Sequence, residues 1–222
     1  MDARVPTSHR AHALKIRGEG QDMKSAEIDQ TTGQLATAVG AVAIVADITY
    51  FAFVAVGEPF GSINDVGYAA TGILAGALAW RLRSRAGTPT TAAALAGAAV
   101  VAAGSGLVLT GTTGWLLAGF VSAVGFGLIG PSVVAANSSL SADGLVPPRL
   151  ATLGRTAGFF MTLGLTAVVP VAMRVDDAAT APGWTWFTMV GWFGAVIIYP
   201  AWAIWLGRVA GRRADRGAPV AG

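Results

Sequence analysis

The sequence predicts an all-α membrane protein, a bundle of six transmembrane helices with the N and C termini both in the cytoplasm. Hydrophobic residues make up 54% of the chain, charged residues only 12%, and the mean hydropathy is +0.60. A typical soluble chain is about one quarter charged, so these 222 residues carry too little charge to cover a soluble surface. The apolar residues also gather in six segments of about 20 residues, the length that crosses a bilayer as a helix.

The basic residues indicate how the bundle is oriented. When the N-terminal segment is placed in the cytoplasm, Arg174 is the only one of the 15 Lys and Arg residues that falls on the outer side. Cytoplasmic loops carry an excess of Lys and Arg, so this alternation predicts the topology as well as the class of protein. Asp176 and Asp177 closely follow Arg174 and leave the outer side acidic.

The two ends of the chain are expected to lie outside the bundle, which occupies 34–207. Residues 1–33 are polar and of mixed charge, so we expect a disordered cytoplasmic tail. They contain no apolar run of the kind that a cleavable signal peptide needs. Thr31 and Gln34 have the spacing of a capping box at the start of the first helix. Residues 208–222 are expected to form a basic cytoplasmic tail.

Short turns separate the first three predicted spans. The first span covers 34–56. The second covers 63–82 and ends in a stop-transfer cluster of arginines, formed by Arg81, Arg83 and Arg85. The third covers 90–110 and consists mainly of Ala, Gly and Val. It leads into 111–114, which is too short for anything but a tight outer turn.

The last three spans are predicted at 115–136, 151–173 and 184–206. Between the fourth and the fifth, the hydroxyl-rich segment 137–150 is expected to be the longest internal loop. It either contacts a partner or substrate or simply forms a polar turn. The sixth span carries aromatic residues near both ends, as the aromatic belts at two membrane surfaces require: Trp184, Trp186, Trp192, Tyr199, Trp202 and Trp205.

The composition excludes several kinds of chemistry. The chain has no Cys, which rules out disulfides, thiolate catalysis and iron–sulfur clusters. Both histidines, His9 and His12, precede the first span, so no His is available inside the membrane. We expect no metal site and no cofactor, since no catalytic or nucleotide-binding motif is present. The basic residues are spread over separate segments, which argues against nucleic acid and favours the lipid bilayer as partner.

Asp47 is the most informative single residue, because it lies near the middle of the first span. An ionisable group at that depth costs about 2.5–3.5 kcal/mol on insertion scales. Burial disfavours the ionised carboxylate, so Asp47 is either neutral or able to exchange a proton. Tyr50 lies one helical turn away and joins it in a candidate ion or proton site. The alternative is that Asp47 only holds two helices together through a hydrogen bond.

Glu58, Asn64 and Asp65 complete this candidate ion or proton site. They place two acids and an amide in the outer turn before the second span, with no basic residue among them. Such a turn suits the entrance of a cation. The structural alternative is that Ser62, Asn64 or Asp65 caps the second helix, because polar caps and acids both stabilise a helix N-terminus.

Arg155, one turn into the fifth span, is a candidate lipid or charge partner. Its long side chain can extend to the inner headgroups, or it can bind an anionic lipid head. It could also pair with a buried acid, although a pair with Asp47 would require it to reach toward the centre of the bilayer.

Glycines recur at the spacing that lets helices approach closely: Gly72 and Gly76, Gly154 and Gly158, and the run Gly125, Gly127 and Gly130. We expect them to pack the bundle, and a homodimer or a partner membrane protein remains open. The richness in Ala, Gly and Arg is typical of a GC-rich bacterial genome. The expected location is therefore the plasma (inner) membrane of a bacterium.

The sequence leaves three functions open. The first is a small transporter or permeation protein that uses Asp47 below the acidic outer turn. The second is a non-transporting regulator, assembly factor or subunit of a larger membrane complex, which the uncharged third and fourth spans favour. The third, an enzyme acting on lipid, is the least supported, since it would have to rely on Asp47, Glu58 or Arg155.

Overall fold

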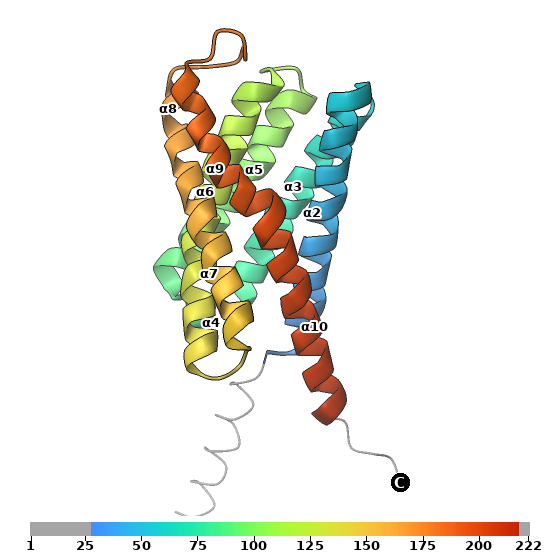
Figure 1. Ribbon diagram of the computed structural model, residues 1–222, viewed down its shortest axis with the longest axis vertical. Coiled ribbons are helices and arrows are strands. Elements are labelled where there is room, and N and C mark those ends of the chain that lie inside the picture. Colours follow the sequence, from blue (N-terminus) through green and yellow to red (C-terminus); the bar gives the residue numbers. More distant parts are fainter. Residues whose placement is uncertain (1–27, 218–222) are drawn as a thin grey trace, which may run out of the picture.

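A computed structural model describes residues 28–217 of the chain. Within that range it consists of helices joined by short turns, with no strand, as predicted (Figure 1). The long helices are α2 (Gln30–Val56), α3 (Phe60–Arg81), α5 (Thr88–Leu109), α6 (Trp115–Ala142), α7 (Pro148–Leu163) and α10 (Tyr199–Gly217). The short ones are α4 (Arg83–Ala86), η1 (Gly164–Ala167), α8 (Val168–Ala172), η2 (Gly183–Thr188), α9 (Met189–Phe193) and η3 (Gly194–Ile198). The expected disorder of the N-terminal tail concerns residues that lie almost entirely outside the described range.

The helices stand side by side in a bundle in which neighbours in sequence are also neighbours in space (Figure 1). α2 packs on α3, α3 on α5, α5 on α6 and α6 on α7. The last helical stretch, α9 through α10, closes the bundle by packing against both α7 and α2. α6 is the most enclosed of the apolar helices.

Five helical segments are long and apolar enough to cross a membrane: Gln30–Val56, Thr88–Leu109, Trp115–Ala142, Pro148–Ala172 and Gly183–Arg212. They correspond to the first, third, fourth, fifth and sixth predicted spans. The second predicted span is α3, which has 22 residues but is not one of the five. Its polar side chains reduce its apolar character: Ser62, Asn64, Asp65, Tyr68 and Thr71.

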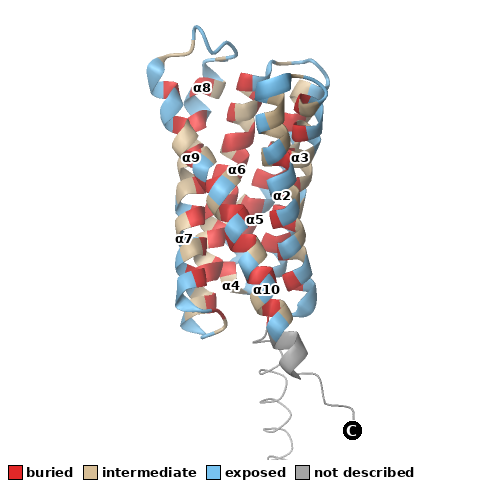
Figure 2. Cartoon of the chain, turned by 45° about the vertical axis from the view of Figure 1, so that its right-hand side comes forward, coloured by how far each residue is buried: buried red, intermediate tan, exposed pale blue. Residues whose placement is uncertain are grey.

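The bundle exposes large apolar side chains and buries small ones (Figure 2). Ile48, Phe51 and Val54 on α2 are each more than 60% exposed, and the buried face of the same helix consists mainly of Ala and Gly. A soluble protein would not expose an apolar surface of this extent. The arrangement suits a lipid environment, in which helices associate through small residues rather than by hiding large ones.

Three pairs of glycines face each other across helix interfaces. A Cβ atom added at Gly125 would lie 2.7 Å from the carbonyl oxygen of Gly97 on α5. One at Gly158 would lie 2.6 Å from that of Gly130, and one at Gly207 would lie 2.7 Å from that of Gly33. The glycines therefore pack the bundle from within. Gly72 and Gly76 face the side chains of Val101 and Ala98 on α5, and Gly154 faces the side chain of Asn137.

The first helix begins earlier than predicted. α2 starts at Gln30, and the carboxylate of Asp29 caps it by accepting a hydrogen bond from the amide of Thr32 at 2.8 Å. The predicted capping box of Thr31 and Gln34 is therefore wrong, because an acid one residue before the helix already occupies the cap position. The hydrogen bonds from Thr32 lower the pKa of Asp29, and Arg81, which pairs with it, lowers it further.

The predicted loop 137–150 is also wrong, since α6 continues to Ala142 and only 143–147 connects it to α7. Asn137 is fully buried on α6 rather than exposed in a loop. Its amide nitrogen donates to the carbonyl oxygen of Val133, and its oxygen accepts a hydrogen bond of 2.9 Å from the indole of Trp202 on α10. An amide with both ends paired is stable inside a helix bundle, whereas the hydroxyl-rich sequence around it resembles a turn.

The aromatic residues of the last span divide between surface and core. Trp184 and Trp186 are about half exposed, at the end of the bundle where an aromatic belt is expected. Tyr199 and Trp202 are only 1% exposed and stack on each other inside the bundle, with ring centroids 5.4 Å apart. The prediction that they belong to a belt is therefore wrong, and their role is in packing.

Charged side chains divide the bundle into a basic end and an acidic end. Among described side chains, the basic end has these arginines: Arg81, Arg83, Arg85, Arg149, Arg155, Arg208 and Arg212. Of the acids at this end whose side chains are described, Asp29 pairs with Arg81 and Asp143 pairs with Arg85. The acidic end, where α2 turns into α3, has among its described residues Glu58, Asp65, Asp176 and Asp177, beside one basic residue, Arg174.

The close approach of α6 and α7 yields a stability prediction. Gly158→Ala should lower the free energy of unfolding by about 1–3 kcal/mol, because the added methyl group would collide with the backbone of Gly130. Gly106→Ala is the matched control: no atom of another described helix lies within 4 Å of its added Cβ, so its stability should stay the same or rise by up to about 1 kcal/mol, the gain of Ala over Gly inside a helix. Denaturation by SDS in mixed micelles, followed by circular dichroism, measures both. Equal stability of the two variants would contradict the packing argument.

Candidate functional site

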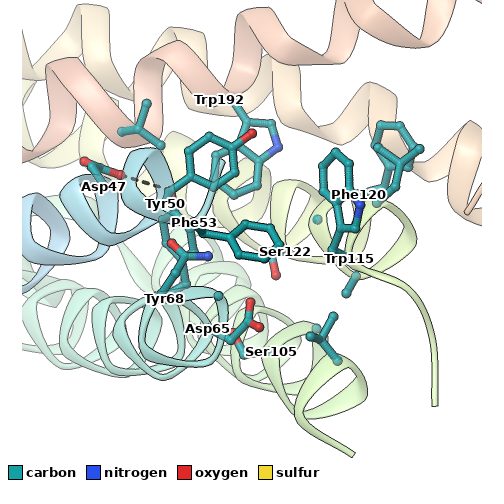
Figure 3. A pocket seen from close by; sticks show the side chains of 18 of the residues that line it. Asp47, Tyr50, Phe53, Asp65, Tyr68, Ser105, Trp115, Phe120, Ser122 and Trp192 are labelled. Atoms are coloured by element: carbon teal, nitrogen blue, oxygen red, sulfur yellow. Dashed lines mark hydrogen bonds between the residues drawn. The ribbon is translucent and has the colours of Figure 1, made fainter. Parts of the chain in front are cut away.

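A cavity of about 360 Å³ lies among α2, α3, α5, α6, α9 and η3, in the half of the bundle nearer the acidic end (Figure 3). All five residues of the predicted ion or proton site line it: Asp47, Tyr50, Glu58, Asn64 and Asp65. Most of the remaining wall is apolar or aromatic, and no Lys, Arg or His is among the lining residues. Residues predicted from separate parts of the sequence therefore share one space.

Asp47 lies deep in this cavity and is half-buried. It is about 14 Å along α2 from Val56, given the rise of about 1.5 Å per residue. The hydroxyl group of Tyr68 on α3 donates a hydrogen bond of 3.0 Å to Oδ1 of Asp47. No other described residue donates a hydrogen bond to this carboxyl group. Tyr68 thus fixes one oxygen of Asp47, and the other oxygen has no described hydrogen-bond donor.

Three aromatic rings close the inner end of the cavity. Tyr68 makes edge-to-face contacts with Trp192 on α9 and Phe126 on α6, at centroid distances of 5.2 and 6.3 Å. Phe126 and Trp192 also contact each other at 6.2 Å, which completes the cluster. Tyr68 and Trp192 line the cavity, whereas Phe126 lies behind them. Beyond this aromatic cluster the bundle continues toward the basic end as packed core.

The last helical stretch departs from regular α-helix beside the cavity. η3 is a single π-helical segment, preceded by the five-residue α9. Trp192 and Val196, from these two segments, face the cavity. Single turns of π-helix within α-helices are frequently found at functional sites.

Glu58 has a structural role as well as a place at the cavity mouth. Its carboxylate accepts hydrogen bonds from the amide and the hydroxyl of Ser62, at 3.3 and 3.1 Å, and so caps α3. From the sequence, Ser62, Asn64 or Asp65 was expected to cap the N-terminus of this helix if the outer turn had only a structural role. Because Glu58 fills this role, capping does not explain Asn64 and Asp65.

Asn64 and Asp65 both face the cavity without a full set of partners. Asn64 is only 7% exposed, and its Oδ1 has no hydrogen-bond partner in the described part of the chain. Asp65 is half-buried, and no described residue donates a hydrogen bond to it. A buried polar atom without a partner costs about 1–3 kcal/mol, so Oδ1 of Asn64 is a hydrogen-bond acceptor that the described part of the fold does not use.

The other acids of the acidic end are already occupied by backbone groups. Asp176 accepts hydrogen bonds from the amides of Gly114 and Leu117, at 2.7 and 3.1 Å, and thereby caps α6 from a distant loop. Asp177 accepts one of 2.9 Å from the amide of Ala179 within its own turn. Neither lines the cavity.

Arg155, the candidate lipid or charge partner, does not belong to this site. It is exposed on α7, and its guanidinium donates a hydrogen bond of 3.2 Å to the hydroxyl of Thr152. It forms no ion pair with Asp47, whose hydrogen-bond donor is Tyr68. An exposed arginine toward the basic end is placed to reach headgroups rather than the cavity.

Sequence reasoning missed four residues that line the site: Tyr68, Trp192 and the buried serines Ser105 and Ser122. Tyr68 has a detectable signal, because it is the only Tyr in the second span and lies one turn after Asn64 and Asp65. Trp192 had no such signal, since the aromatic residues of its span all suit a membrane surface.

The described residues contain no group of three or more His, Cys, Asp or Glu side chains arranged to hold a metal ion. Comparisons of the chain with protein-family models, with curated proteins and with solved structures find no match. The residues that line the cavity can accept hydrogen bonds, attract positive charge and enclose an apolar group.

The hydrogen bond between Tyr68 and Asp47 can be tested by stability. Tyr68→Phe keeps the aromatic contacts but removes the hydroxyl, and should lower the free energy of unfolding by about 1 kcal/mol. Tyr50→Phe is the control, because no described partner binds its hydroxyl. In a double-mutant cycle with Asp47→Leu, which removes the acceptor oxygen, unfolding in micelles should show a coupling between Tyr68 and Asp47. Strict additivity of the two substitutions would count against the bond.

Proposed function

We propose that the chain is a small multi-pass protein of the plasma (inner) membrane of a bacterium, with six spans and the acidic end outside. In this proposal α3, the second span in chain order, is added to the five apolar segments and brings the number of spans to six. Its 22 residues make a helix of about 33 Å, which matches the apolar thickness of a bilayer, and it packs between α2 and α5. The arginines of the basic end support a cytoplasmic location for that end and for both termini.

Within this topology, we propose that the protein is a transporter or permeation protein for cations. One observation carries the proposal: a single cavity, free of basic side chains, joins the intramembrane acid Asp47 to the acids of the outer turn. If Asp47 only held two helices together, the geometry would require its bond to Tyr68 but no adjoining cavity.

The positions of the acids suggest a path for the cation. Glu58 is exposed at the mouth of the cavity, Asp65 is half-buried further inside, and Asp47 lies at the inner end. Negative charges that line a cleft with low-dielectric walls raise the local concentration of cations. A carboxyl group at the inner end can also exchange its proton for a cation, which would couple the two movements.

The aromatic cluster of Tyr68, Phe126 and Trp192 supports a state that is open toward the acidic end and closed toward the basic end. Passage through the bundle would require these rings to separate. Transporters that alternate between two openings need such a closed layer on one side of their site.

The topology can be tested on single cysteines, because the natural chain contains none. Ser62 and Ser84 are both exposed and flank α3. In intact cells, a membrane-impermeant maleimide should label S62C, and should label S84C only after permeabilisation. Labelling of both variants from the same side would exclude α3 as a span.

The transport proposal can be tested in proteoliposomes with an entrapped pH dye. Na⁺, K⁺ and benzyltrimethylammonium, whose fixed charge prevents it from crossing the bilayer unaided, are offered as cations. We expect cation-dependent proton flux that Asp47→Asn abolishes and that Asp177→Asn leaves intact, because Asp177 lies outside the cavity. Equal flux in wild type and Asp47→Asn would contradict the proposal and favour a non-transporting regulator, assembly factor or subunit.

A further inference from the structure

We propose that the cavity binds an organic ammonium ion, a protonated amine attached to an aromatic or otherwise apolar body. The inference rests on the proposed function, in which cations enter from the acidic end, and it adds the class of cation. Three features of the cavity carry it: unpartnered hydrogen-bond acceptors, uncompensated negative charge and an aromatic wall.

The acceptors define the head of the ligand. Asn64 is only 7% exposed, yet its Oδ1 has no hydrogen-bond partner in the described structure. Asp65, its neighbour in sequence, receives no hydrogen bond from a described residue. An ammonium group supplies up to three N–H donors to such acceptors. A ligand without donors would leave them unpaired.

The charge of the cavity requires a positive head. Asp47 and Asp65 both line it, and no basic side chain does. Tyr68 orients Asp47 by binding one of its oxygens. Hydrogen bonds between an ionised donor and an ionised acceptor are about twice as strong as neutral ones, so an ammonium ion gains more here than an alcohol.

The wall defines the body of the ligand. Aromatic side chains from α2, α6 and α9 line the cavity, among them Tyr50, Phe53, Trp115, Phe120 and Trp192 (Figure 3). Aromatic faces attract cations within about 6 Å of the ring centre and also bury apolar groups. A volume of about 360 Å³ falls in the range of about 300–1,000 Å³ that small-molecule sites occupy.

A bare metal ion suits this cavity less well. Ca²⁺ takes about six to eight oxygen ligands at short range, and the described acids do not converge in groups of three. The walls are too apolar to hold the hydration shell that an ion would otherwise retain. An organic cation satisfies both the acids and the aromatic wall.

Binding can be measured by isothermal titration calorimetry on the full-length protein in detergent. The probes are 2-phenylethylammonium, its neutral counterpart 2-phenylethanol, and methylammonium, which lacks the aromatic body. We expect 2-phenylethylammonium to bind at least about tenfold more tightly than either of the others. Equal affinity for the alcohol would mean an apolar pocket for lipid or detergent chains, and equal affinity for methylammonium would mean a site for small cations. Either result overturns the inference.

Two acids of the acidic end provide a matched pair of variants. Asp47→Asn should weaken binding of 2-phenylethylammonium about tenfold or more and leave 2-phenylethanol unchanged. Asp177→Asn removes the same charge outside the cavity and should leave both affinities unchanged. Equal weakening by the two variants would indicate a general effect of surface charge and overturn the inference.

Asn64→Leu separates a ligand-binding role from a structural one. The change removes an oxygen that has no partner in the protein, so the unliganded variant should unfold at the same or a higher temperature than wild type. Its affinity for 2-phenylethylammonium should nevertheless fall severalfold. Lower thermal stability with unchanged affinity would assign Asn64 to the fold and overturn its role in binding.

The binding and flux experiments fail independently. Selective binding of 2-phenylethylammonium without any flux would support the cavity as an organic-cation site and contradict transport. Flux of Na⁺ or K⁺ that depends on Asp47, without selective binding of 2-phenylethylammonium, would support transport and overturn the class of ligand.

Discussion

The structure depends on how closely its helices approach one another. At Gly125, Gly158 and Gly207 a single added methyl group would meet the backbone of the next helix. Lipid supplies no hydrophobic force between helices, so dispersion contacts at these short distances have to hold the bundle together. The large apolar side chains are then free to face outward, which explains why exposure and residue size are correlated on α2.

The cavity lies in the half of the bundle nearer the acidic end, where aromatic side chains line the space between helices. Toward the basic end and the middle, glycine pairs bring α2 against α10 and α6 against α7. Toward the acidic end, Phe53, Trp115 and Phe120 line the cavity. The same end contains the acids whose hydrogen-bonding capacity the fold does not use. The cavity and these acids therefore lie in the same half of the bundle.

Much of the fold could be predicted from sequence, because hydropathy and charge are properties of the local chain. Helix ends were less accessible: Asp29 caps α2 instead of Thr31, and Asn137 continues α6 because Trp202, 65 residues away in sequence, satisfies its amide. The candidate site was predicted from the cost of placing Asp47 in a membrane. Tyr68 and Trp192 were missed, since only tertiary structure shows that they face Asp47 and the cavity.

The depth of Asp47 has an electrical consequence. In the proposed topology its carboxyl group lies about 14 Å below the acidic end, roughly half of the apolar thickness of the bilayer. One elementary charge that crosses a full potential of 100 mV changes its energy by about 2.3 kcal/mol, so a cation that descends to Asp47 gains roughly half of that amount. The interior-negative voltage of a living cell would therefore draw cations into this cavity and strengthen their binding severalfold, before any change in the shape of the protein.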